Sequence, residues 1–394
     1  PLNHPISVTV PGAVAGWIEL SKKYGNLKIE EILNLGIELC HEGFEINEEL
    51  YNSLNLHKEE LSGQASGYGF YRDNQPFETG KMIRRPQLGK TLELLKKNGL
   101  EYFYDSDITK SISSSVNGIL SYDDLKNFKA EWKKPLHSKI YGFDGWTSPP
   151  STQGYLTLST LKAIEMLDAE HDDIHRIIET YRIFAADRDN ITYDYGKNIK
   201  DFKGVDLDYI QEKIKLFNPN HSEKFDFPKP RGGGTAYMNT VDKNGLGVSL
   251  IQSNFHGIGS RIGVGSFGFF LHNRGCGFNL DSGHPNYLTP GRKPLHTLSP
   301  TIWSKNGNLE FIAGTRGGRY QPQLLIQTIL PYIQKSDSFE EIIKEPRWVI
   351  ENFSNDTLSK LRFEKINNED LKILLQKGHE VEVENKFNKA YGPI

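Results

Sequence analysis

The sequence predicts an α+β protein on the basis of two observations. Before residue 234, apolar residues recur at helical spacing, as they do from Ile29 to Cys40. After it, the chain becomes richer in glycine and in strand-like runs, two of which are joined by Asn244-Gly245. We therefore expect a helix-rich part over residues 1–234 and a strand-rich part over residues 235–394.

Length and charge set weak bounds on function. A chain of 394 residues is long enough for two or three domains. Its 47 basic and 50 acidic residues are balanced, which argues against a nucleic-acid-binding surface. Two cysteines, Cys40 and Cys276, are too few for a disulfide framework or a thiolate zinc site. No apolar run reaches transmembrane length and no signal peptide is visible, so we expect no membrane span and a cytoplasmic location, although the chain opens on Pro1 without a Met.

Helices are expected in order along the first part. The first follows Pro11-Gly12, and the second covers Ile29 to Cys40. A third carries apolar residues from Leu88 to Leu95 and ends before Gly99. Ser121 and Asp124 form a capping-box variant that begins a fourth helix.

His171 and His175 stand four residues apart in a further helical stretch. This spacing can place two imidazoles on one helix face as metal ligands. The stretch is amphipathic, however, and Ile174, Ile177 and Ile178 supply its buried side. We expect a solvated histidine face and no metal.

A β-hairpin around Asn244-Gly245 is the most informative stretch. If residues 243–245 form a three-residue loop with Gly245 in the left-handed region, Asp242 pairs with Leu246, and counting back places Ser253 opposite Thr235. Glycines 232–234 allow a sharp bend, so the Thr235 hydroxyl could attack the Gly234 carbonyl. Cleavage there would give Thr235 a free α-amine with a pKa of about 7.7 to 8.0, which is a suitable internal base. The alternative is a flexible glycine loop before an ordinary edge strand.

The run from Phe311 to Ala313 predicts a buried strand. A second glycine turn, which contains Gly317 and Gly318, follows this strand. Residues 321–333 then predict an apolar helix, and residues 339–383 predict further helices. The N–H groups of Gly317 and Gly318, at a turn before a helix, can stabilise a developing oxyanion. Close packing of the strand against the helix would require the same two glycines.

The motifs Gly232-Gly-Gly-Thr235, Thr240 to Gly245, Gly291 to Pro300 and Gly314 to Gly318 follow one another in an order that resembles the γ-glutamyltransferase family. The resemblance implies a four-layer α-β-β-α sandwich of the N-terminal nucleophile hydrolases, made as one precursor. It further implies a cut between Gly234 and Thr235, fragments 1–234 and 235–394 that stay associated in one intertwined domain, and neither cofactor nor metal.

The resemblance also assigns site residues. It implies that Thr235 is the nucleophile, that Gly317 and Gly318 form the oxyanion hole, and that Thr297 contacts a substrate carboxylate where His296 replaces a second hydroxyl. Tyr237 completes the expected substrate-binding set. Where well-studied family members carry an acid that binds the substrate amine, this chain has Gly277, while Arg274 introduces a cation three residues earlier. Arg274 could bind a carboxylate or form a structural ion pair.

We therefore expect a self-processing amidohydrolase that acts on a small γ-glutamyl amide such as glutathione, or on a related short-acid amide. Gly277 and Arg274 keep open a preference for oxamate-type monoamides. The resemblance also implies terminal segments beyond both ends of this chain. The alternative is a catalytically weak relic with a binding or structural role. Assembly with further copies of the chain stays open.

Overall fold

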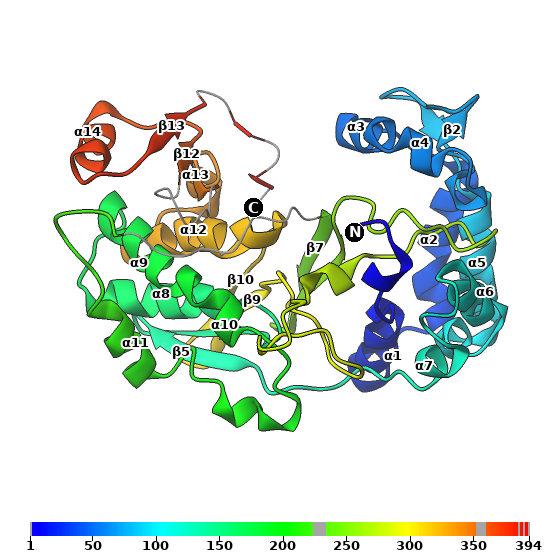
Figure 1. The fold of residues 1–394 in the computed structure, drawn as a ribbon, viewed down its shortest axis with the longest axis horizontal. Coiled ribbons are helices and arrows are strands. Elements are labelled where there is room, and N and C mark those ends of the chain that lie inside the picture. Colours follow the sequence, from blue (N-terminus) through cyan, green and yellow to red (C-terminus); the bar gives the residue numbers. More distant parts are fainter. Residues whose placement is uncertain (1, 224–233, 352–359, 385–386, 389–390, 393–394) are drawn as a thin grey trace. The chain divides into compact units, whose positions relative to one another are not determined.

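The computed structural model describes residues 2–223, 234–351, 360–384, 387–388 and 391–392 (Figure 1). The chain divides into two compact units, residues 1–132 with 254–276 and residues 133–253 with 277–394. Each unit takes residues from both sides of Gly234. A cut before Thr235 would therefore leave two fragments that interpenetrate within each unit.

The first unit is mainly helical, as the sequence predicts. Its helices are α1 (Ala13–Tyr24), α2 (Ile29–Glu42), α3 (Glu48–Leu56), α4 (Lys58–Leu61), α5 (Pro86–Asn98), α6 (Asp107–Ser115) and α7 (Tyr122–Lys126). Its strands are two-residue pairs, β1 (Phe44–Glu45) with β4 (Met82–Ile83), and β2 (Tyr71–Arg72) with β3 (Gln75–Pro76). The capping box at Ser121 and Asp124 is confirmed, and α5 ends just before Gly99, whose φ of 87° is incompatible with a further helical residue.

A four-stranded antiparallel sheet with the order β10-β9-β6-β5 forms the centre of the second unit. Its strands are β5 (Leu136–Ile140), β6 (Phe143–Thr147), β9 (Thr301–Lys305) and β10 (Asn308–Ala313). Two of them, β5 and β6, precede residue 234, within the part of the chain that the sequence predicts to be mostly helical. The β5–β6 hairpin turns at Tyr141 and Gly142, whose φ values of 47° and 80° are those of a type I′ turn.

Helices cover one face of this sheet. The helices of the unit are α8 (Tyr155–Met166), α9 (Ile174–Ala186), α10 (Arg188–Ile191), α11 (Leu207–Ile214), α12 (Gln321–Lys335), α13 (Phe339–Ile342) and α14 (Asn368–Gln376). Trp303 and Phe311 from the strands join Leu158 and Leu325 from the helices in one buried cluster. Because side chains alternate along a strand, Ile312, which follows Phe311, points to the opposite face of the sheet.

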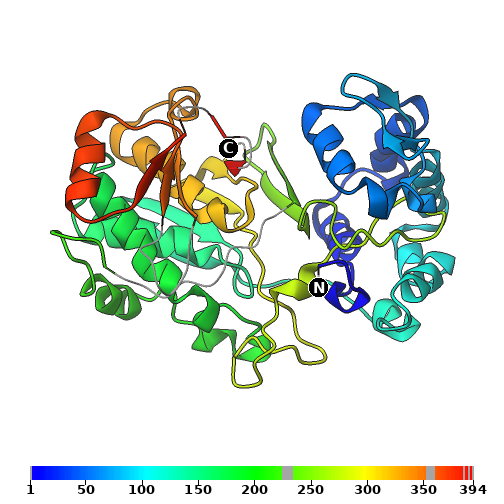
Figure 2. The ribbon, with the colours of Figure 1, turned by 45° about the horizontal axis from the view of Figure 1, so that its top comes forward.

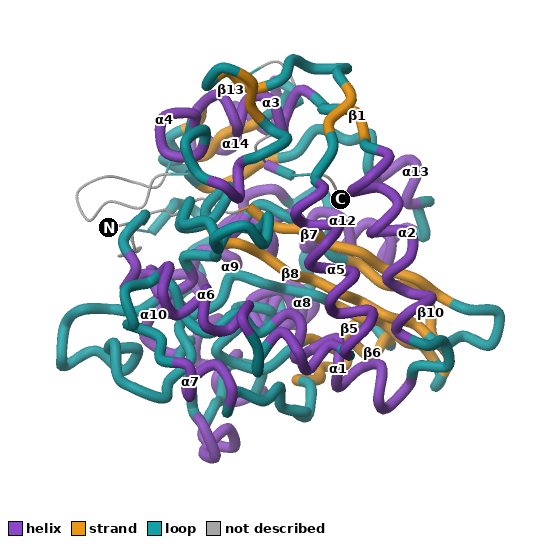
Figure 3. Tube along the Cα trace, turned by 90° about the vertical axis from the view of Figure 1, so that its right-hand side faces the viewer, coloured by secondary structure: helices purple, strands orange, loops and turns teal. Residues whose placement is uncertain are grey.

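The predicted hairpin lies on that opposite face. It consists of β7 (Gly234–Val241) and β8 (Gly247–Phe255), which pair only with each other among the described strands. Gly247 lies so close to the side chains of Leu309 and Ile312 that a Cβ there would approach both to 2.8 Å. Figure 3 shows β7, β8 and β10 side by side. The second unit thus stacks helices, sheet and hairpin in that order, and the predicted α+β class is confirmed.

The C-terminal region differs from the prediction of helices for residues 339–383. Three short strands, β11 (Trp348–Ile350), β12 (Leu361–Phe363) and β13 (Val381–Val383), form a separate sheet (Figure 2). β12 pairs antiparallel to β11 and parallel to β13. Since β11 is buried at every position, it lacks the alternation by which a strand is recognised from sequence.

Candidate functional site

The hairpin has the turn that the sequence predicts. Gly245 has a φ of 82°, and the Asp242 N–H donates to the Leu246 carbonyl at 3.0 Å. The Asp242 carboxylate also accepts the N–H groups of Asn244 and Leu246, each at 2.8 Å. These bonds fix the turn and therefore the pairing register of the two strands. A slip of one residue would turn every side chain of a strand to the other face.

This register places Ser253 opposite Thr235, as we expect from counting residues back along both strands from the turn. Thr235 Oγ1 donates to Ser253 Oγ at 3.0 Å, and Ser253 Oγ donates to the Gly234 carbonyl at 2.7 Å. Both hydroxyl residues are half-buried. Two consecutive hydrogen bonds therefore join the Thr235 hydroxyl to the carbonyl that it would attack. Glycines 232 and 233, which the sequence motif includes, lie outside the described residues.

Tyr237 links the hairpin to the second glycine turn. Thr235 and Tyr237 are two residues apart and so share one face of β7. The Tyr237 ring lies directly against Gly314, where no larger side chain would fit, and its hydroxyl is 3.0 Å from Ser249 Oγ. Burial raises the pKa of Tyr237, so the phenol stays neutral near pH 7. The face of β7 that carries Thr235 is thus the face that meets the segment leading to Gly317.

Gly317 and Gly318 form the turn that the sequence predicts. Gly317 has a φ of 117° and caps a 3₁₀ turn, Gly318–Tyr320, that continues directly into α12. Gly318 has a φ of 60°. Within the described part of the chain, no backbone acceptor is present for the N–H of either glycine. Two N–H groups in a left-handed turn before a helix can bind an anion.

The C-terminal segment lies behind this turn, a contact that the sequence reasoning missed. A Cβ on Gly317 would be 2.5 Å from the Tyr391 carbonyl, and the Tyr391 ring packs edge-on against Tyr320 with centroids 5.8 Å apart. Tyr391 is only 1% exposed. Both the positive φ at position 317 and the close approach of the Tyr391 carbonyl therefore require glycine there. No pattern in the sequence indicates this contact, since 74 residues separate Gly317 from Tyr391.

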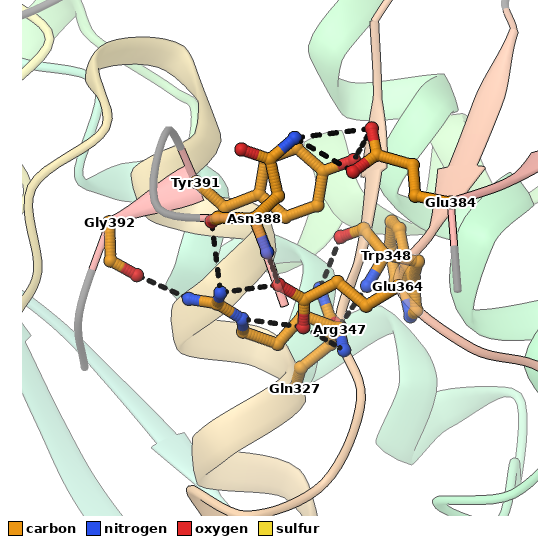
Figure 4. Close-up of polar contacts among 8 residues, drawn as sticks. All are labelled: Gln327, Arg347, Trp348, Glu364, Glu384, Asn388, Tyr391 and Gly392. Atoms are coloured by element: carbon orange, nitrogen blue, oxygen red, sulfur yellow. Dashed lines mark hydrogen bonds and ion pairs between the residues drawn. The ribbon is translucent and has the colours of Figure 1, made fainter. Parts of the chain in front are cut away.

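A buried ion pair holds that segment in place (Figure 4). Arg347 binds Glu364 through two nitrogens, at 3.0 and 2.5 Å, and also donates to the carbonyls of Asn388 and Gly392. Glu364 in turn accepts the Asn388 N–H at 2.6 Å. Burial favours the neutral acid, but the hydrogen bonds from Arg347 and Asn388 outweigh it and hold the pKa of Glu364 below its usual value.

His296 and Thr297 lie on a loop that pairs with residues 151–153. The His296 N–H donates to the Ser151 carbonyl at 2.7 Å, and the Gln153 N–H donates to the His296 carbonyl at 3.0 Å. Thr297 is 5% exposed, whereas His296 is half-buried. The structure thus places both predicted substrate-binding residues on one loop of the unit that contains Thr235. Their contact with a substrate stays a prediction.

Gly277 and Arg274 belong to one short 3₁₀ turn, Arg274–Gly277. A Cβ on Gly277 would collide with the Leu295 carbonyl, so an acidic side chain does not fit here without a backbone shift. Arg274 is 3% exposed, and its guanidinium lies 4.3 Å from the centre of the Phe255 ring. Burial lowers the pKa of Arg274 to about 9. The role of Arg274 in substrate binding stays a prediction.

His171 and His175 do not form the solvated helix face that the sequence predicts. His171 precedes α9, and His175 is 3% exposed instead of solvated. His175 Nδ1 is 2.9 Å from Nε2 of the buried His379, and its Nε2 is 3.0 Å from the Asn218 carbonyl. Burial lowers the pKa of both imidazoles.

Among the described residues, no cluster of three His, Cys, Asp or Glu could hold a metal ion, and no helix is long and apolar enough to span a membrane.

Known proteins resemble this chain in sequence and in fold. A family model described as Gamma-glutamyltranspeptidase matches residues 1–392. The chain is 28% identical to the glutathione hydrolase-like YwrD proenzyme of Bacillus subtilis, covering 98% of this chain and 75% of the relative. It is 29% identical to the oxamate amidohydrolase proenzyme of Klebsiella pneumoniae, with shares of 98% and 76%. The crystal structure of cephalosporin acylase from Bacillus halodurans superposes with a TM-score of 0.88 at 25% identity, covering all of this chain and 74% of the acylase.

Proposed function

The chain belongs to the gamma-glutamyltranspeptidase family, and from this premise we propose that it is a self-processing amidohydrolase with Thr235 as its N-terminal nucleophile. The observation that carries the proposal is the pair of hydrogen bonds from Thr235 Oγ1 to Ser253 and from Ser253 to the Gly234 carbonyl. A precursor that cuts itself needs a hydroxyl, a proton path and a polarised carbonyl, and these two bonds supply all three.

Self-cleavage follows along these bonds. Thr235 Oγ1 attacks the Gly234 carbonyl carbon, its proton passes to Ser253 Oγ, and the Ser253 proton passes to the carbonyl oxygen as negative charge develops there. The bond between the Gly234 carbon and the Thr235 nitrogen then breaks, and the nitrogen takes up a proton. Water hydrolyses the resulting ester, which leaves a carboxylate on Gly234 and a free amine on Thr235.

Turnover then uses the new N-terminus. The α-amine, with a pKa of about 7.7 to 8.0, accepts the hydroxyl proton while Oγ1 attacks the substrate amide. The N–H groups of Gly317 and Gly318 stabilise the oxyanion, and the protonated amine donates to the leaving amine. Water then attacks the acyl-enzyme with the same base. Tyr237 and Thr297 bind the acyl part of the substrate, and both fragments remain associated.

The substrate class that we propose is a small amide of γ-glutamyl or related short-acid type. The relatives named for glutathione and for oxamate both fall in this class. Gly277 excludes an acidic side chain at its own position, which supports substrates that need no amine contact there. Arg274 is the cation that we propose for the carboxylate of an oxamate-type monoamide.

Denaturing gel electrophoresis tests the proposal. The purified chain should separate over time into residues 1–234 and 235–394, with Thr235 identified as the new N-terminus by sequencing. Thr235→Ala should stay intact, and the control Thr240→Ala, on the exposed part of the same strand, should cleave normally. A wild-type chain that stays whole at neutral pH would favour the alternative of a catalytically weak relic.

A substrate panel tests the specificity. A γ-glutamyl anilide and oxamate should be compared with wild type and Arg274→Ala, with folding of both proteins checked by circular dichroism. Loss of oxamate hydrolysis alone in Arg274→Ala would support the monoamide preference. A strong preference for the γ-glutamyl compound that is independent of Arg274 would reject it.

A further inference from the structure

Gln153 connects two predicted parts of the site. It lies between β6 and α8 and is completely buried. Its side-chain Nε2 donates to the Thr297 carbonyl at 2.9 Å and to the Gly318 carbonyl at 2.9 Å. One amide group therefore uses both of its N–H bonds to join the loop of Thr297 to the turn of Gly318.

The orientation of this amide is fixed from its other side. Arg188, which is 8% exposed, donates to Gln153 Oε1 at 3.3 Å. Because arginine has only donors, the oxygen of the amide must face Arg188 and the nitrogen must face the two carbonyls. Arg188 is itself held by Asp189 at 2.7 Å.

The backbone of the same residue supports the arrangement. The Gln153 N–H donates to the His296 carbonyl at 3.0 Å, next to the carbonyl of Thr297 that the side chain binds. Gln153 thus holds the His296–Thr297 loop by two bonds and the Gly318 turn by one. Asparagine, shorter by one methylene, would not span the same two carbonyls.

We propose that Gln153 is a positioning residue, which sets the spacing between the oxyanion-binding turn at Gly318 and the substrate-binding loop at Thr297. The inference rests on the proposed function and deepens it. Oxyanion donors are effective only when they lie 2.7–3.1 Å from the developing charge. Without the Nε2 donor, the Thr297 loop keeps the backbone bond from Gln153 to His296, whereas the turn loses its bond from Gln153 to Gly318. Transition-state stabilisation should therefore fall more than substrate binding, which lowers kcat more than it changes KM.

Gln153→Met tests this inference, because methionine has a similar volume but donates no hydrogen bond. We expect kcat of the cleaved enzyme, per Thr235 N-terminus, to fall about 30-fold, less than the loss of roughly 10²–10³ that follows removal of a whole donor. KM should change less than about 3-fold, and the rate of self-cleavage should stay near that of wild type, because the hairpin carries its own hydroxyls and carbonyl.

Gln334→Met is the matched control. Gln334 also uses Nε2 for two bonds at 2.9 Å, to Tyr141 Oη and the Ala169 carbonyl, in the same unit but away from the site. It should lose thermal stability while kcat stays unchanged. Equal losses of kcat in Gln153→Met and Gln334→Met would overturn the inference, as would an unchanged kcat in Gln153→Met.

Gln153→Glu gives a second, independent readout and serves if Gln153→Met does not fold. The ionised carboxylate of this variant can accept from Arg188 but cannot donate to either carbonyl, whereas the protonated acid can donate one bond. The ratio of its kcat to that of wild type should therefore rise at least about 3-fold as pH falls from 8 to 5.5. A ratio independent of pH would overturn the positioning role. An inactive wild type would instead refute the proposed function, and this inference with it.

Discussion

Ser253→Ala should slow self-cleavage strongly. The substitution removes one hydroxyl that makes two bonds, at 3.0 Å from Thr235 Oγ1 and at 2.7 Å to the Gly234 carbonyl. Loss of a donor to a carbonyl that becomes an oxyanion costs roughly 10²–10³ in rate, and loss of a proton-transfer partner costs about 10² or more. Since one hydroxyl serves both steps, these factors overlap, and we expect about a 10²-fold loss, or about 2.7 kcal/mol of transition-state stabilisation.

The assay follows cleavage on denaturing gels after refolding at pH 7.5, with the fraction of intact chain fitted to a single exponential. Ser253→Thr keeps a hydroxyl and should retain most of the rate. Ser249→Ala is the matched control, because Ser249 lies on the same face of β8 and bonds to Tyr237 instead of Thr235. Cleavage of Ser253→Ala at the rate of Ser249→Ala would refute the proton path through Ser253.

Three further predictions concern the surroundings of the site. Gly317→Ala should lower kcat at least about 10-fold and destabilise the fold by about 1–3 kcal/mol, because φ is 117° and the new Cβ would meet the Tyr391 carbonyl. Arg347→Met should cost about 3–5 kcal/mol in urea unfolding, because it leaves the buried carboxylate of Glu364 without its cation. His379→Asn should flatten the dependence of stability on pH. Burial lowers the pKa of His379 to about 3 from 6.5, so its neutral form contributes fully above pH 6.5 and stability falls as pH drops below it. Between pH 7 and 5, wild type should lose about 2 kcal/mol more than the variant.

Each of these predictions has a control. Gly307→Ala also places alanine at a positive φ, 83°, but in open space, so it should cost less than Gly317→Ala and leave kcat unchanged. Lys344→Met breaks an exposed ion pair and should not shift the urea midpoint measurably. Gln334→Met, which removes no titratable group, should keep the pH slope of wild type. If a control matches its partner variant, the corresponding explanation is wrong.

Short-range sequence patterns were sufficient to predict the hairpin and several helices. Asn244-Gly245 fixed a turn, the turn fixed a register, and the register placed Ser253 opposite Thr235 without any long-range information. Helices with an apolar stripe, such as α2 and α5, were found in the same way. The short strand β11 was missed, because three consecutive buried residues give neither the period of a strand nor that of a helix.

Contacts between distant segments could not be predicted in this way. Gln153 reaches Thr297 and Gly318 across the sequence, and a single glutamine carries no periodicity that would single it out. The contact of Tyr391 with Gly317 is of the same kind. In both cases a glycine turn was recognised from its residues, whereas the groups that hold it became visible only when the chain was folded.

This division between local and distant contacts implies that self-cleavage and turnover depend on different parts of the fold. The groups for cleavage, Thr235, Ser253 and the Gly234 carbonyl, all lie at the open end of one hairpin, whose turn is held by its own bonds. The proposed oxyanion turn, by contrast, is held by Gln153 on one side and by the segment of Tyr391 on the other. Substitutions at Gln153 or Gly317 should therefore yield chains that process themselves yet turn over slowly, because cleavage requires only the hairpin whereas turnover requires contacts that join three distant segments.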